Sequence, residues 1–217
     1  MFVLFVTSFL LLSSLCINGM ESEPLHEPES QISLIMQDYV SEELKVLFAQ
    51  NQQIRARMAR EEKLVPRKQY FYELSARNRA HVTKLKKIIA QYGWPCMQKF
   101  DAVAAHSAWM MALNADEDPD FQFGCLKLMI KEMEQNHILP YQIAFLTDRF
   151  RVNRNLPQEY GTQLDENGQL LLPIAGFNSG YLTDENFEAL NEKREVMGLN
   201  SLQEYLLDAY KNRKGLQ

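Results

Sequence analysis

Polar side chains fall on the apolar faces of three expected helices. Asn51 and Arg55 are four residues apart within an apolar stripe of the first helix, and residues at this spacing are neighbours on a helix surface. Asn78 and His81 lie in the corresponding stripe of the second helix, and His106 in that of the third. Burying an unpaired polar group costs about 1 to 3 kcal/mol, so we expect these residues either to pair with one another or to line a wet cavity.

A second polar group follows in the chain. Asp148, Arg149 and the segment 155–163 offer a carboxylate, a guanidinium, amides and a phenol, a set suited to binding a polar or anionic small molecule. The alternative is that Asp148, Arg149 and Gln163 only cap helices and pin a loop.

An acid–base reaction would use a histidine as the general base and a carboxylate to orient it. The candidate catalytic residues are His81, Asp116 and Asp148. The candidate ligand-binding residues are Asn51, Arg55, Asn78, His106, Asn114, Gln122, Arg149, Gln158, Tyr160 and Gln163.

Other chemistries have no signature in this chain. There is no glycine-rich nucleotide loop, no G-x-S-x-G and no H-E-x-x-H. Glu134 and His137 have the spacing of one di-iron ligand pair, but a second pair is missing. We therefore expect no metal site, and the sequence identifies no cofactor.

The elements that must position these groups are mainly helices. The periodicity predicts a mainly α, bundle-like single domain of several helices with one small β-hairpin near 160–172, where Asn167-Gly168 separates two short apolar runs. The expected helices span about 31–64 (with an interruption near 39–41), 68–92, 99–114, 118–136, a shorter one from 140, 184–197 and 202–212. Gly93, Asp118-Pro119 and the Ser201-x-x-Glu204 capping box mark helix ends.

The first 19 residues read as a signal peptide, because residues 2–15 are almost purely apolar and Gly19 offers a small residue for cleavage. A retained membrane anchor is the alternative. Residues 20–30 are an acidic, flexible leader, and 31–217 form the domain. We therefore predict a secreted or periplasmic protein with no membrane span after cleavage.

Cys96 and Cys125, the two cysteines that remain after cleavage, then either form a disulfide or stay as buried thiols.

The 217-residue chain has a formal net charge of -5, which argues against a dedicated nucleic-acid binder. Its charge is unevenly distributed, because the stretch 45–99 is strongly basic and both flanks are acidic. Such a stretch suits phosphates or an anionic membrane, but solvated outer helix faces are the interpretation we favour.

Several short motifs resemble those of a bacterial family of unknown function. The resemblance covers about 51–163 and rests on these segments: Asn51-Gln52-Gln53-Ile54-Arg55, Tyr92-Gly93-Trp94-Pro95, Asn114-Ala115-Asp116, Phe121-Gln122, Phe145-Leu146-Thr147-Asp148-Arg149 and Gln158-Glu159-Tyr160-Gly161-Thr162-Gln163. The family has D-Q-x-x-R, Y-G-W-P, H-A-D, F-Q, Y-L-T-D-R and Q-x-Y-G-T-Q. The resemblance implies a shared fold and a shared site, but the family has no known reaction to carry over to this chain. This chain has Asn51 for the usual Asp and Asn114 for the usual His, and an amide cannot act as an imidazole base.

The sequence thus favours a pocket that binds a small polar or anionic molecule or a peptide group, with acid–base catalysis on it as a further expectation. The competing interpretation is a non-catalytic secreted interaction protein whose buried polar residues are structural. The first predicts that the candidate residues converge on a cavity, and the second that they are paired off in a closed core.

Overall fold

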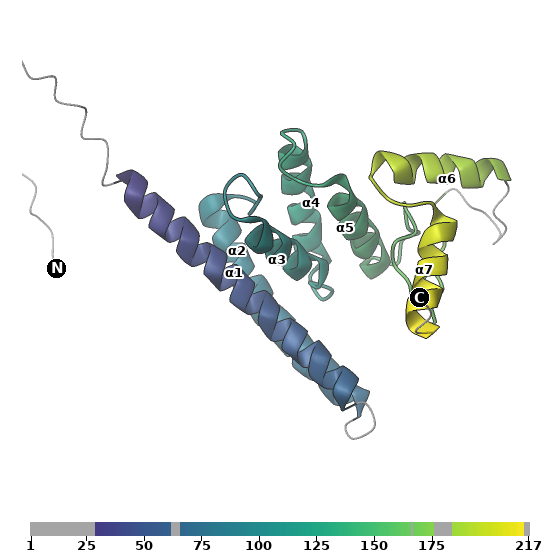
Figure 1. The fold of residues 1–217 in the computed structure, drawn as a ribbon, viewed down its shortest axis with the longest axis horizontal. Coiled ribbons are helices and arrows are strands. Elements are labelled where there is room, and N and C mark those ends of the chain that lie inside the picture. Colours follow the sequence, from purple (N-terminus) through teal and green to yellow (C-terminus); the bar gives the residue numbers. More distant parts are fainter. Residues whose placement is uncertain (1–28, 62–65, 166, 176–183, 215–217) are drawn as a thin grey trace, which may run out of the picture.

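Seven helices make up most of the described chain, which comprises residues 29–61, 66–165, 167–175 and 184–214 of a computed structural model (Figure 1). In chain order they are α1 (Glu29–Arg60), α2 (Arg67–Tyr92), α3 (Ala102–Leu113), α4 (Pro119–Met133), α5 (Pro140–Asn153), α6 (Asp184–Val196) and α7 (Leu202–Lys214). The expected mainly α single domain is confirmed. The predicted signal peptide and most of the leader lie outside the described residues.

The first two helices form a long antiparallel pair along one side of the molecule (Figure 1). The 32 residues of α1 span about 48 Å. The interruption expected near 39–41 does not occur. Val40 and Ser41 are both buried there, and packing outweighs the weak helix propensity of these residue types.

Helix α3 lies at the centre and packs against α1, α2, α4 and α5. Ala104, Ala108 and Ala112 are completely buried, and their small side chains let the neighbouring helices approach closely. Trp109 fills the space toward α5, where its indole N–H donates to the carbonyl of Gln142 at 3.0 Å. The main core therefore surrounds α3.

Apolar periodicity places Phe71 and Val103 on the inward faces of their helices, yet the structure exposes both side chains. Phe71 and Val103 are each 58% exposed. Phe71 lies near the start of α2, on the wall of the cavity described below, and Val103 lies in the first turn of α3. Near a helix end the neighbouring helices cover fewer sides, so periodicity alone misjudges burial there.

The helix ends follow the expected local chemistry. Gly93 ends α2 with φ 73° and donates its N–H to Ile89, a conformation that glycine adopts easily. Asp118 caps α4 by accepting from the N–H of Phe121, and Pro119 follows it. Ser201 and Glu204 bond to each other as a capping box before α7.

The expected hairpin is reduced to isolated bridges in the described part of the chain. Leu164 pairs with Leu170 antiparallel, and Gln158 with Ile174 parallel. The Asp165 carboxylate accepts from the backbone N–H groups of Asn167 and Gln169, both at 2.8 Å. These local side-chain bonds compete with a strand ladder, so a turn forms without strands.

A smaller apolar cluster joins this loop to the last two helices through Ile174, Leu190 and Leu202. Helices α6 and α7 lie beyond α5, on the right-hand side of the view in Figure 1.

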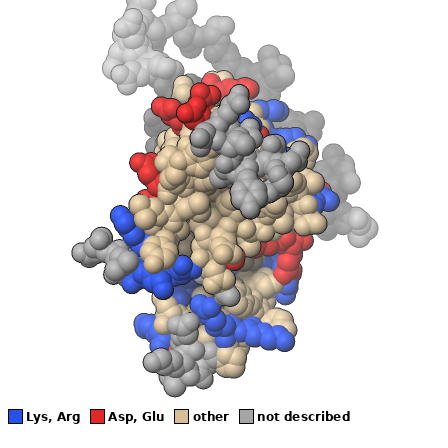
Figure 2. Space-filling model, turned by 90° about the vertical axis from the view of Figure 1, so that its right-hand side faces the viewer, with Lys and Arg blue, Asp and Glu red and all other residues tan. Residues whose placement is uncertain are grey.

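The basic residues of 45–99 are extensively paired with acids. Arg57 pairs with Glu73, and Lys84 pairs with Glu43 at 3.0 Å. On the face seen in Figure 2, Lys and Arg gather toward the lower end, with acidic side chains above them.

No helix in the described part of the chain is long and apolar enough to cross a membrane. Cys96 and Cys125 are both buried free thiols, the second of the two expected alternatives.

Candidate functional site

A cavity of about 490 Å³ lies between α2 and the connection from α3 to α4, and α1 and α5 each contribute one arginine to its wall. Five of the predicted site residues line it, namely Arg55, Asn78, Asn114, Asp116 and Arg149. The remaining lining residues are Phe71, Leu74, Ser75, Arg79, Val82, Thr83, Lys86, Ala115, Glu117 and Asp118. The cavity therefore brings together residues up to 94 positions apart in the chain.

One face of α2 supplies much of the wall. Ser75, Arg79, Val82 and Lys86 recur every three to four residues and therefore share one side of the helix. Arg79 and Lys86 are exposed and pair with acids of the turn after α3, which agrees with the interpretation of the basic stretch as solvated outer helix faces. Both residues lie outside the apolar stripe of α2 that contains Asn78, so helical periodicity alone does not mark them as cavity residues.

The connection 114–118 presents several polar side chains in a short turn. The Asn114 backbone N–H donates to Met110, and that of Asp118 donates to Ala115. Ala115 is buried and anchors the turn. This anchoring directs the side chains of Asn114, Asp116, Glu117 and Asp118 to the cavity wall.

Three ion pairs fix the charged groups of the wall. Asp116 accepts two hydrogen bonds from Arg149, from Nε to Oδ1 and from Nη2 to Oδ2, each 2.6 Å long. Glu117 pairs with Arg79 at 2.9 Å, and Asp118 pairs with Lys86 at 2.6 Å.

These contacts keep the neighbouring carboxylates ionised. Hydrogen bonds from Ser75 and Arg79 hold the pKa of Glu117 below its ordinary value. The hydrogen bond from Lys86 does the same for the pKa of Asp118, against the opposing effect of burial.

Arg55 differs from the other cations of the wall. Its Nη2 donates to Asn114 Oδ1 at 3.1 Å, and among the described residues no carboxylate pairs with it. The wall thus holds four cations (Arg55, Arg79, Lys86 and Arg149) against three carboxylates. The surplus positive charge belongs to Arg55.

Asn51 and Asn78 meet across the α1–α2 interface. Asn51 is buried, and its Nδ2 donates to Asn78 Oδ1 at 2.7 Å. This bond occupies the oxygen of Asn78 and leaves its amide N–H donors available at the cavity wall. The buried Asn51 Oδ1 has no hydrogen-bond partner among the residues that the structure describes. Asn51 therefore does not line the cavity itself but orients the Asn78 side chain that does.

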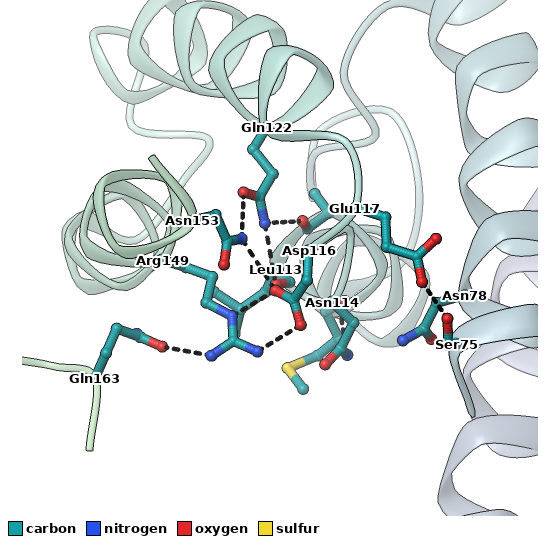
Figure 3. Close-up of polar contacts among 12 residues, drawn as sticks. Ser75, Asn78, Leu113, Asn114, Asp116, Glu117, Gln122, Arg149, Asn153 and Gln163 are labelled. Carbon is teal, nitrogen blue, oxygen red and sulfur yellow. Dashed lines mark hydrogen bonds and ion pairs between the residues drawn. The ribbon is translucent and has the colours of Figure 1, made fainter. Parts of the chain in front are cut away.

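Polar residues around Arg149 hold the far wall (Figure 3). Gln163 Oε1 accepts from Arg149 at 3.4 Å. Asn153 donates to Asp116 at 3.1 Å and to Gln122 Oε1 at 2.9 Å. The buried Gln122 in turn donates to the carbonyl of Ala112 at 3.2 Å. Gln122 and Gln163 thus support the wall from behind.

Asp148 faces away from the cavity, although it is next to Arg149 in the chain. It is completely buried and accepts from the backbone N–H groups of Glu159 and Thr162 at 2.6 and 2.8 Å, and from the Thr162 hydroxyl at 2.9 Å. Burial raises its pKa, and these hydrogen bonds partly offset the effect. Asp148 therefore organises the loop after α5.

Gln158 and Tyr160 belong to the same loop. Gln158 is buried, accepts from Gln163 N and donates to the carbonyls of Gln163 and Leu172. The carbonyl of Tyr160 accepts from Arg194. Arg194 of α6 is only 1% exposed. Its neighbours in the chain are mostly polar, so apolar periodicity does not predict its burial.

The two candidate histidines do not line the cavity. His81 is buried on another side of α2, where its Nε2 lies 3.3 Å from Gln50 Oε1. Burial, together with the charges of Arg77 and Lys84, lowers its pKa to about 4. His106 packs between the rings of Phe48 and Trp109. The expected trio of His81, Asp116 and Asp148 is thus not brought together.

The chain belongs to a family of unknown function, DUF6624, whose match covers residues 38–213. The expectation of an uncharacterised domain is confirmed. Comparisons with curated proteins and with solved structures gave no match.

Proposed function

We propose that the cavity between α2 and the 114–118 turn binds a small organic anion, such as a carboxylate or a phosphate ester, through Arg55. The observation that carries this proposal is that Arg55 lines the cavity without a carboxylate partner among the described residues. A guanidinium that keeps free N–H donors is well matched to a carboxylate or phosphate. Asn78 adds neutral donors to the same wall.

The apolar and ion-paired sides of the cavity indicate what the ligand carries besides its anionic group. Leu74, Val82 and Phe71 give the cavity an apolar side, which would take an aliphatic or aromatic group. The three ion pairs fix the polar side, so little reorganisation is needed on binding. The proposed ligand is therefore an anion that also carries an apolar group.

Acid–base catalysis remains the further part of the proposal. Among the described residues the acids at the cavity are Asp116, Glu117 and Asp118, and each accepts from a cation. A carboxylate held in this way is a better orienting group than a base. Binding is accordingly the activity that we test first.

The test compares thermal unfolding with and without inorganic phosphate, acetate and phenylacetate. A ligand at 100 times its Kd stabilises the folded state by about 2.7 kcal/mol. We expect at least one anion to raise Tm of the wild type, and Arg55→Gln to abolish the rise while keeping its helix content. Arg60→Gln is the matched control, because Arg60 is an exposed arginine on the same helix that does not line the cavity.

A rise of equal size in Arg55→Gln would refute the site. If no anion changes Tm of the wild type, the interaction-protein interpretation takes its place.

We further propose that the protein is exported and acts outside the cytoplasm. The apolar run 2–15 followed by Gly19 supports this. Intact-mass measurement of the protein from an expressing bacterium tests it, because cleavage after Gly19 removes a defined mass. An uncleaved chain would contradict the signal peptide.

A further inference from the structure

Three potential metal ligands meet at the end of α4, outside the cavity. They are Cys96, Glu132 and His137, and their Sγ, carboxylate oxygen and ring nitrogen all lie within 4.8 Å of one another. Cys96 is completely buried, whereas Glu132 and His137 are partly accessible. None of the three lines the cavity described above.

Two of the three distances between these atoms come within about 0.4 Å of those around a tetrahedral ion, and the third, from Cys96 Sγ to the His137 ring nitrogen, is at most 4.8 Å. Glu132 Oε2 is 3.5 Å from Cys96 Sγ and 2.9 Å from His137 Nδ1. In a tetrahedral zinc site, bond lengths of about 2.3 Å to sulfur and about 2.0 Å to nitrogen and oxygen place the sulfur about 3.5 Å and the nitrogen about 3.3 Å from the oxygen. Small side-chain adjustments would therefore bring all three atoms to a common ion.

Lys99 occupies the other oxygen of the same carboxylate. Its Nζ lies 2.7 Å from Glu132 Oε1, so that Oε2 alone faces the thiol and the imidazole. Lys99 would thus orient the ligating carboxylate by hydrogen-bonding its other oxygen, a common role for residues that contact metal ligands without touching the metal.

The backbone holds these groups before any ion binds. The N–H of His137 donates to the carbonyl of Glu132 at 3.0 Å, and Asn136, with φ 59°, donates to Met133 at 2.9 Å. This turn at the end of α4 brings the His137 ring back toward Glu132. On the opposite side, the carbonyl of Cys96 accepts from Phe100 at 2.9 Å.

We propose that Cys96, Glu132 and His137 bind a zinc ion, with water as the fourth ligand. Sulfur, imidazole nitrogen and carboxylate oxygen are the donors that zinc takes in proteins. Binding requires the Cys96 thiolate and an unprotonated His137 Nδ1, so the thiol releases one proton to solvent as the zinc–sulfur bond forms, and the Nδ1 proton that faces Glu132 moves to Nε2 of a neutral ring or leaves a charged ring for solvent. The ion would join the α2–α3 connection to the end of α4, in contrast to the sequence-based expectation of no metal site.

Cobalt(II) is the probe for this site, because cobalt bound to a thiolate has a charge-transfer absorption that oxygen and nitrogen ligands do not give. The experiment uses the full chain in a Cys16→Ala background, so that the third cysteine cannot contribute. The variants are Cys96→Ala, Glu132→Gln and His137→Gln. Cys125→Ala and Glu134→Gln are the controls, since Cys125 is the other buried thiol and Glu134 an exposed acid two residues from Glu132.

We expect the parent protein and both controls to show the absorption at one cobalt per chain, and zinc to displace it. Cys96→Ala should lose it, and Glu132→Gln and His137→Gln should weaken cobalt binding at least tenfold. Zinc should raise Tm of the parent but not of Cys96→Ala.

The proposal is overturned if the parent shows no thiolate absorption, or if Cys96→Ala keeps it. Should Cys96→Ala not fold, as judged by circular dichroism, His137→Gln decides the question, because unchanged cobalt affinity in that variant also overturns the site.

Discussion

Arg149 holds Asp116 by two parallel hydrogen bonds of 2.6 Å, which tie α5 to the turn between α3 and α4. The two residues are 33 positions apart and contribute the guanidinium and the carboxylate of one cavity wall. Lysine cannot form such a two-pronged contact. The pair therefore sets the shape of the wall as well as its charge.

Replacing Arg149 with lysine should loosen this wall more than it destabilises the protein. Both side chains are partly exposed, so we expect a loss of about 1 kcal/mol in the free energy of unfolding. Any anion that stabilises the wild type should bind more weakly. Arg154→Lys is the control, because Arg154 pairs with the exposed Asp120 away from the cavity. Urea denaturation and the anion-dependent Tm shift measure the two effects, and equal anion shifts in both variants would contradict the positioning role.

Asp148→Asn should destabilise the whole loop after α5. The buried carboxylate accepts from three backbone N–H groups and one hydroxyl, and an amide would turn N–H donors toward some of these. We expect a loss of about 2 to 3 kcal/mol. Asp208→Asn, on an exposed position of α7, should change little. Chemical denaturation decides this, and a loss below about 0.5 kcal/mol would show that the carboxylate is dispensable.

Two glycine substitutions should act in opposite directions. Gly161 has φ +69°, and a Cβ there would lie 2.9 Å from Ile174 Cδ1, so Gly161→Ala should cost about 1 to 3 kcal/mol. Gly124 lies inside α4, and a Cβ there meets nothing within 4 Å. Gly124→Ala should therefore stabilise by about 0.5 to 1 kcal/mol. Tm values of the two variants on the same side of the wild type would contradict this interpretation.

His81 should make stability depend on pH. Its folded pKa is about 4 against an ordinary 6.5, so the unfolded chain binds a proton that the folded chain does not. The free energy of unfolding should then fall as the pH drops from about 6.5 to about 4, by at most about 3 kcal/mol. His81→Gln removes this contribution and should flatten the curve over that range. Denaturation at several pH values tests it, and parallel curves for the two proteins would rule it out.

The sequence alone determined most of the helical architecture. Gly93, Asp118-Pro119 and Ser201 with Glu204 marked helix ends that the structure contains, because capping depends on residues that are close in the chain. The hairpin was overestimated, since a turn motif does not reveal that Asp165 would satisfy the neighbouring N–H groups itself.

Only the tertiary structure decided which inward polar residues share a site. Asn78 and His81 are three residues apart, so their side chains leave α2 in directions that differ by about 60°. Helix α1 packs against both, with Asn51 bonding Asn78 and Gln50 facing His81, and this leaves only Asn78 on the cavity wall. Likewise, Asp148 and Arg149 are adjacent in the chain but point to different neighbours. Helical spacing fixes the direction of a side chain relative to its own helix, whereas the packing of helices distant in sequence determines what that side chain meets.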